Sequence, residues 1–209
     1  LCRNSGLSFE QRLFKRIFDI VVSVIGLIIL SPFMLIIAAA IKIDDGGSII
    51  YKQKRLTING KEFFVYKFRS MIPNAEKNGV PQLATGSDSR ITRVGKFLRK
   101  CRLDELPQLF NIIKGDMSVV GPRPERPELT EKYEREMPEF KFRLKVKAGL
   151  TGYAQVTGVY DTTPYDKLKM DLMYIERYSM VMDLRIILMT IKTMISPGEM
   201  NSEADKEKY

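Results

Sequence analysis

The segment from Ile20 to Ile41 contains no charged residue, and this apolar run limits the folds open to the chain more than any other feature. A helix needs about 20 apolar residues to cross the hydrocarbon core of a bilayer, and the run meets that length. Such a length disfavours a helix buried in a soluble core. It also disfavours a secretory signal peptide, whose apolar region is shorter. A membrane segment is therefore predicted, either a simple transmembrane helix or a re-entrant one.

Two features favour the re-entrant form. Ser31-Pro32 lies at the centre of the run, where proline removes a backbone donor and clashes with the preceding turn. Both flanks are basic, whereas a spanning helix normally has its excess of Lys and Arg on one side. The flanking cations are Arg12, Lys15 and Arg16 before the run and Lys42, Lys52, Lys54 and Arg55 after it. We predict a helix that enters the membrane, breaks at Ser31-Pro32 and returns, with both ends in the cytosol.

Composition narrows the chemistry. The chain has no histidine, which excludes imidazole bases, histidine zinc ligands and Ser-His-Asp triads. Cys2 and Cys101 lie far apart without CxxC spacing, so neither a disulfide scaffold nor a zinc or iron–sulfur site is expected. Lys and Arg number 34 against 25 Asp and Glu, and the net charge of +9 favours a polyanionic partner: nucleic acid, an anionic membrane face or phosphorylated small molecules. Any catalysis would depend on carboxylates and cations.

The rest of the chain predicts an α+β fold that is mostly helical. Two β-like stretches, 49–51 and 63–66, flank Asn59-Gly60 and indicate a small hairpin. Apolar periodicity predicts helices over 92–101, 105–113, 128–143 (interrupted at Pro138), 166–178 and 183–195. The last of these could be core or could lie on the membrane surface. Gly149 to Gly152 is expected to form a turn before a strand over 153–156, and 74–90 is expected to be a polar loop.

Asp104 and Glu105 are adjacent carboxylates inside the strongly basic stretch from Arg90 to Arg123. Asp104 could be the N-cap of the following helix, and it could equally be a nucleophile that attacks a phosphoryl group; the two roles are compatible. Glu105 could then hold Mg²⁺, which prefers oxygen ligands and keeps substrate phosphates in its shell.

Three further cations could neutralise phosphate. Lys67 and Arg69 alternate with aromatic residues on a predicted strand and could point to one face, although a solvated polar face has the same pattern. Arg123 stands between two prolines that preset its backbone, and it could present its guanidinium to a diphosphate or could simply belong to a structural turn.

Four motifs in order carry a family resemblance: Lys67-Phe-Arg-Ser-Met71, Arg102-Leu-Asp-Glu-Leu-Pro-Gln-Leu-Phe-Asn111, Lys114-Gly-Asp-Met-Ser-Val-Val-Gly-Pro-Arg-Pro124 and Gly149-Leu-Thr-Gly-Tyr-Ala-Gln155. They resemble the signature blocks of the bacterial sugar transferases, the monotopic phosphoglycosyl transferases that load undecaprenyl phosphate. The resemblance runs from about Phe14 to Ser196 and includes Ser31-Pro32, which in that family lies in a re-entrant membrane helix.

The resemblance implies a two-step reaction. Asp104 would attack the β-phosphate of a UDP-sugar, release UMP and hold the sugar phosphate covalently, and polyprenyl phosphate would then take it to give a polyprenyl diphosphate sugar. This is a first membrane step of bacterial glycoconjugate or exopolysaccharide assembly. Glu105 would be the Mg²⁺-associated residue. The resemblance places phosphate-binding cations at Lys67, Arg99 and Arg123 and a further acidic position at Asp171. Together with Arg69, which the strand pattern suggests, these are the predicted substrate-binding residues.

These inferences predict a chain of four parts. Residues 1–13 would be a polar lead-in with an interfacial amphipathic segment, residues 14–45 the re-entrant helix, residues 46–196 a compact cytosolic catalytic domain and residues 197–209 a polar tail. The expected location is the cytosolic face of the bacterial inner membrane. The lead-in resembles the junction in larger family members, so we expect the catalytic C-terminal part of a longer transferase.

Two rival hypotheses remain at this point. A non-catalytic basic module that binds membrane or nucleic acid would fit the charge balance, but the missing Trp, the lack of an aromatic-rich RNA motif and the apolar run count against nucleic acid. A multi-spanning transferase of the other phosphoglycosyl type would need several apolar segments. The sequence leaves open the sugar, the lipid chain length and whether the chain forms a homodimer.

Overall fold

The computed structural model describes residues 7–72, 75, 88–158 and 162–195. It is mostly helical, with two small two-stranded sheets, which confirms the predicted α+β class. The long helix α1 (Phe9–Asp45) begins with a capping box between Ser8 and Gln11 and ends at Gly46, whose positive φ of 71° suits glycine. The predicted loop 74–90 falls largely outside the described residues, and the tail 197–209 falls wholly outside them.

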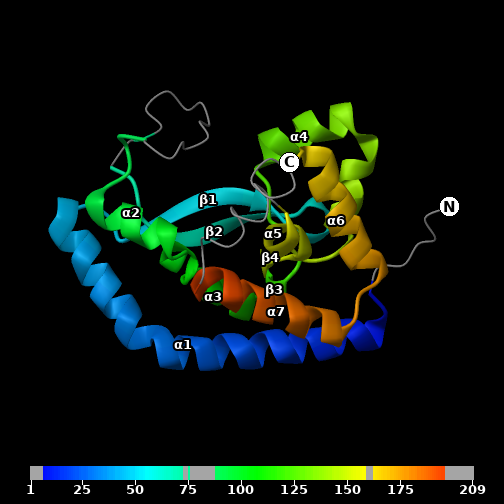
Figure 1. Cartoon of the computed structure of the whole chain (residues 1–209), viewed down its shortest axis with the longest axis horizontal. Helices are drawn as coiled ribbons and strands as arrows, with labels where there is room; N and C mark the ends of the chain where they lie inside the picture. The colour runs from blue at the N-terminus through cyan, green and yellow to red at the C-terminus, as the bar shows by residue number, and fades with distance from the viewer. Residues whose placement is uncertain (1–6, 73–74, 76–87, 159–161, 196–209) are drawn as a thin grey trace, which may run out of the picture.

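The helix α1 is continuous across Ser31-Pro32, where a break was predicted. Proline has no N–H for the carbonyl of Ile28, four residues earlier, and the Ser31 hydroxyl donates a hydrogen bond to that carbonyl at 3.0 Å instead. The lost helical bond is thereby replaced. Figure 1 shows the result: α1 bends as it passes below α7 and rises along α2, and it does not fold back on itself.

The first half of α1 attaches to the rest of the molecule through polar contacts. Lys15 Nζ lies 2.5 Å from Asp183 Oδ2 on α7 (Met180–Ile195), and both side chains are buried. Arg16 donates to the carbonyls of Ile112 and Ile113, at 2.6 and 2.7 Å, in the last turn of α3 (Gln108–Lys114). Two of the cations that flank the apolar run, Lys15 and Arg16, are thus engaged in contacts within the protein.

The second half of α1 attaches to the same body. Asp45, the last helical residue, forms an ion pair with Arg69, and Asp44 accepts a hydrogen bond from the backbone of Val94 at 3.3 Å. Between the two attachments, the outer face of α1 leaves large apolar side chains exposed: Val21, Val24, Ile25, Ile28, Ile29, Phe33, Leu35 and Ile36. The helix is thus fastened at both ends, and its apolar face points away from the body.

The predicted hairpin is confirmed. Strand β1 (Ile50–Leu56) pairs antiparallel with β2 (Glu62–Phe68), with Tyr51 opposite Lys67. The connection includes the short helix η1 (Ile58–Gly60), where Asn59 and Gly60 both have positive φ, as the Asn-Gly pair suggests.

A second sheet was not predicted. Strand β3 (Ser118–Val120) pairs in parallel with β4 (Gly149–Thr151), and the residues after it form helix α5 (Tyr153–Thr157). The predicted turn at 149–152 and strand at 153–156 are therefore wrong. A Cβ atom at Gly149 would lie 2.1 Å from the nitrogen of Gly121, so only glycine allows the two backbones to come this close.

The remaining elements are α2 (Arg93–Lys100), η2 (Leu103–Glu105), α4 (Pro127–Glu136), η3 (Pro138–Lys145) and α6 (Pro164–Glu176). Figure 1 shows helix α2 on the left of the molecule and helices α4 and α6 on the right. The predicted helices are confirmed to within a few residues, except that 105–113 divides into η2 and α3. The main core gathers around Val65, Ile112, Met117, Val120, Tyr174 and Ile186.

Candidate active site

Asp104 and Glu105 lie in η2, the short 3₁₀ turn between α2 and α3. Arg102 enters this turn with a φ of +53°, a left-handed conformation that costs a non-glycine residue about 1–3 kcal/mol. The cap of α3 is Pro107, with no side-chain cap bond. Asp104 is therefore not the N-cap of the following helix, and that alternative is wrong. Its side chain is left for another use.

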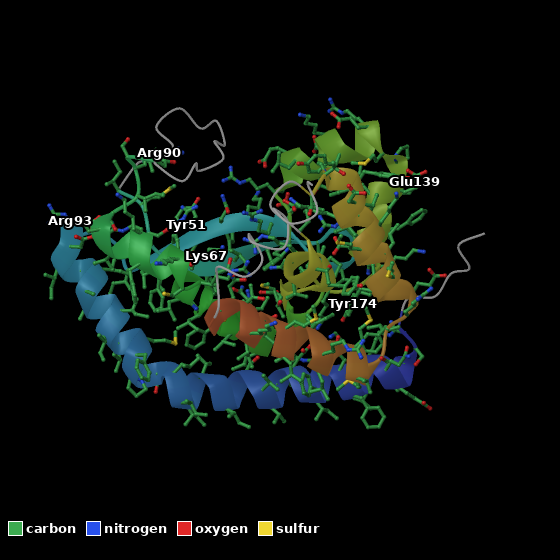
Figure 2. All side chains as sticks on the ribbon, in the orientation of Figure 1. Tyr51, Lys67, Arg90, Arg93, Glu139 and Tyr174 are labelled. Atoms are coloured by element: carbon green, nitrogen blue, oxygen red, sulfur yellow. The ribbon has the colours of Figure 1, made fainter. Side chains whose placement is uncertain are left out.

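Glu105 is held by two cations from distant parts of the chain. Its Oε1 atom accepts from Lys67 Nζ on β2 at 2.7 Å and from Arg123 Nη2, after β3, at 3.2 Å. Burial alone would raise the pKa of Glu105, but the charges of Arg123 and Lys67 outweigh it and hold the pKa at about 2. Figure 2 shows Lys67 near the centre of the molecule, where β2 approaches α2 and α3.

Asp104 has different surroundings. The Asp104 side chain is half-buried, and this burial raises its pKa. The negative charge of Glu105 raises the pKa further, whereas the positive charges of Lys67 and Arg99 lower it. Arg99 is exposed in the last turn of α2. Asp104 is thus the more basic of the two carboxylates, while Glu105 is the one bound by cations.

A hollow opens beside Glu105. It is lined by Arg55, Val65, Lys67, Glu105, Gln108, Arg123 and Pro124. The cations outnumber the carboxylate, and Arg123 remains 45% exposed although it contacts Glu105. An anionic ligand such as a phosphate would find several charge-assisted donors here.

The backbone that carries Arg123 is held at four consecutive carbonyls. Prolines at 122 and 124 have no N–H, so this segment can only accept hydrogen bonds at those positions. The donors are Gly149 N to Pro122 O (2.9 Å), Arg143 Nη2 to Arg123 O (2.9 Å), Arg55 Nη1 to Pro124 O (3.0 Å) and Leu56 N to Glu125 O (3.0 Å). Two of these donors, Arg143 and Arg55, are side chains. Their contacts with this segment were not predicted from the sequence, because the residues that meet are far apart in the chain.

Asp171 lies behind this segment. It is 2% exposed, and its Oδ2 accepts from Arg143 Nη2 at 2.7 Å and from Nε at 3.1 Å. Asp171 is thus connected to the backbone carbonyl of Arg123 through the guanidinium of Arg143. Its predicted contact with substrate stays a prediction.

Arg69 also lies apart from the hollow. The strand β2 ends at Phe68, so the alternation that would place Arg69 beside Lys67 does not continue. Its guanidinium pairs with Asp45 and packs so closely on Gly47 that a Cβ there would overlap it. The role of Arg69 in substrate binding is likewise still a prediction.

A magnesium ion is compatible with this site. Within the described residues no group of three or more carboxylates or thiols could hold a metal, but Mg²⁺ commonly takes only one or two protein carboxylates and completes its shell with phosphate and water. Lys67 and Arg123 both contact Oε1 of Glu105, and Glu105 is the residue that would offer a carboxylate oxygen to Mg²⁺.

Fold and site together join a hollow lined by Lys67, Glu105 and Arg123 to a body that carries one long apolar helix. Residues 10–197 match the family described as "Bacterial sugar transferase", so the chain belongs to the bacterial sugar transferase family. The predicted membership is confirmed.

Three relatives illustrate the match. The chain is 42% identical over 185 residues to the UDP-N-acetylgalactosamine-undecaprenyl-phosphate N-acetylgalactosaminephosphotransferase of Aeromonas hydrophila, covering 87% of this chain and 44% of that protein. It is 43% identical over 193 residues to the UDP-glucose:undecaprenyl-phosphate glucose-1-phosphate transferase of Klebsiella pneumoniae (90% and 41%). It is 40% identical over 194 residues to the exopolysaccharide production protein PSS of Rhizobium leguminosarum bv. phaseoli (88% and 96%). The chain thus spans less than half the length of the first two.

Proposed function

We propose that this chain is the catalytic unit of a phosphoglycosyl transferase that moves a sugar 1-phosphate from a UDP-sugar to polyprenyl (undecaprenyl) phosphate. The family and the names of the relatives support the reaction class. The observation that carries the proposal is the Asp104-Glu105 pair, in which one carboxylate is bound by Lys67 and Arg123 and the other is not.

Asp104 acts as the nucleophile in this scheme. A carboxylate oxygen of Asp104 forms a bond to the β-phosphorus of the UDP-sugar, the bond from that phosphorus to the bridging oxygen breaks, and UMP leaves with the electron pair. An oxygen of polyprenyl phosphate then attacks the same phosphorus, and the bond to Asp104 breaks to regenerate the carboxylate. The product is a polyprenyl diphosphate sugar, and no oxidant or reductant is needed.

The cations supply electrostatic stabilisation. Lys67 and Arg123, already at the hollow, would bind the phosphoryl oxygens as charge develops on them, and Arg99 would neutralise charge near Asp104. Glu105 orients Lys67 and Arg123 and would be the protein ligand of Mg²⁺. When bound, Mg²⁺ supplies Lewis-acid stabilisation of the diphosphate.

The attachment of α1 supports a monotopic arrangement. Among the described residues α1 is the single helix long and apolar enough to cross a membrane. Its two ends bind one body, through Lys15 with Asp183 and through Asp45 with Arg69. A helix held this way keeps its ends on the same side of a bilayer. We propose that it dips into the cytosolic leaflet of the bacterial inner membrane, with the body in the cytosol.

Release of UMP tests the proposal directly. The protein, reconstituted with undecaprenyl phosphate, is incubated with a panel of UDP-sugars, and UMP and the lipid-linked product are measured together. We expect one or a few UDP-sugars to give both products in equal amounts, with turnover stopped by excess EDTA and restored by Mg²⁺. A protein that binds vesicles but releases no UMP from any UDP-sugar would be a non-catalytic membrane module. Full turnover in excess EDTA would refute the magnesium requirement.

A further inference from the structure

Gln108 has a buried amide that the structure leaves without a partner. Its side chain is 3% exposed at the start of α3, and its Nε2 atom makes no hydrogen bond within the described residues. Buried polar groups are nearly always paired, because an unpaired one has lost its water without gaining a substitute. The missing partner therefore points to a ligand.

The position of Gln108 indicates what kind of ligand this is. The residue lines the same hollow as Lys67, Glu105 and Arg123. Lys67 and Arg123 bring only donors, and both are already directed at Oε1 of Glu105. The described residues give the Gln108 amide no acceptor, and a ligand atom that would suit both this amide and the two cations is an anionic oxygen.

We propose that Gln108 is a substrate-binding residue whose Nε2 donates a hydrogen bond to a phosphoryl oxygen of the UDP-sugar diphosphate. This rests on the proposed function and adds a neutral, directional donor to the cations already assigned. Lys67 and Arg123 would supply charge, and the amide would help to fix the orientation of the phosphoryl group.

The substitution Gln108→Leu separates this role from a structural one. Leucine has a similar size and no polar atom, so the unliganded variant should keep or raise its melting temperature, because an unpaired buried donor is removed. Its dissociation constant for the UDP-sugar should rise about tenfold to a hundredfold, the usual effect of losing a hydrogen bond to a charged group. UDP alone should show the same loss. As a matched control, Ser23→Ala on α1 removes another buried polar group without a partner among the described residues, outside the hollow, and should leave the dissociation constant unchanged.

Several outcomes would overturn the inference. A lower melting temperature with unchanged affinity would make Gln108 structural, and no change in either would mean that a water molecule is its partner. A loss seen with UDP-sugar but not with UDP would place the contact on the sugar. If Gln108→Leu does not fold, Gln108→Glu serves as the second variant. It keeps the shape of the side chain but replaces the donor by an anion, so it should bind UDP-sugar more weakly than wild type does. If the wild-type protein neither binds nor turns over UDP-sugars, the proposed function itself is refuted. If the wild-type protein is active and Gln108→Leu has the same affinity for UDP-sugar, only this inference is refuted.

Discussion

Asp104 and Glu105 are neighbours in the chain, yet contacts from remote residues give them different chemistry. Lys67 and Arg123 reach Glu105 from two other elements, and Asp104 keeps the higher pKa. The sequence motif identified the pair, and its basic surroundings indicated phosphate. Which carboxylate the cations would bind could not be predicted, because that depends on how β2 and the segment after β3 pack against η2.

The substitution Asp104→Asn tests the nucleophile. Asparagine has nearly the same shape but lacks the anionic oxygen, so folding should be close to wild type while sugar-phosphate transfer falls roughly a thousandfold or more. With UDP-sugar and no lipid, mass spectrometry should find a sugar phosphate on wild type at Asp104 and none on the variant. A folded variant with a near wild-type rate would place the nucleophile elsewhere, with Glu105 the first candidate.

The depressed pKa of Glu105 predicts a dependence of stability on pH. The pKa falls from its ordinary value of 4.5 to about 2 in the folded protein, so the unfolded chain binds the proton more readily. This carboxylate therefore stabilises the fold above about pH 4.5, and its contribution is lost as the pH falls towards 2. In urea titrations between these values, wild type should lose more stability than Glu105→Gln. Parallel curves for the two proteins would show that the pKa is not depressed.

At the scale of elements, local signals predicted local structure well. Asn59-Gly60 predicted the hairpin, and Thr92 caps α2 where the amphipathic pattern begins. The pairing of β3 with β4 was missed because it joins residues about 30 positions apart through backbone contact at Gly149. A break was predicted at Ser31-Pro32, but the helix is continuous there and only bends, because the serine hydroxyl replaces the hydrogen bond that proline removes.

Arg143 holds the backbone carbonyl of Arg123, and this contact leads to a prediction for Asp171. Asp171→Asn keeps the shape but weakens the hold on Arg143, and with it the hydrogen bond from Arg143 to the Arg123 carbonyl. A small displacement of Arg123 should lower kcat about tenfold to a hundredfold, with less effect on KM for the UDP-sugar. The matched control is Glu131→Gln, an exposed carboxylate on α4, which should change neither constant. A large rise in KM with unchanged kcat would instead support the direct substrate contact predicted from the family resemblance.

At the scale of the whole molecule, buried polar contacts join the long apolar helix α1 to the body. Lys15 on α1 pairs with Asp183 on α7, and Asp183 also accepts from the Tyr174 hydroxyl of α6 at 2.7 Å. Burial raises the pKa of Tyr174, and the charge of Asp183 raises it further, so the phenol stays protonated and keeps donating. Figure 2 shows Tyr174 on α6, in the same region as α7 and the start of α1. No local pattern predicts this network, because Lys15 lies 168 residues before Asp183 in the chain.

This double attachment predicts the topology of α1 in cells. With Cys2 and Cys101 replaced by serine, single cysteines are placed at Glu10, near one end of α1, and at Ile43, which is 85% exposed near the other. A membrane-impermeant maleimide should label neither position in intact spheroplasts and both after permeabilisation, because one cytosolic body holds both ends. A cysteine at Ile28, in the exposed apolar face, should react slowly in both cases, since lipid excludes the charged reagent. Labelling of position 10 from outside, with position 43 protected, would show that α1 spans the bilayer and that its contacts with Asp183 or Arg69 break in the membrane.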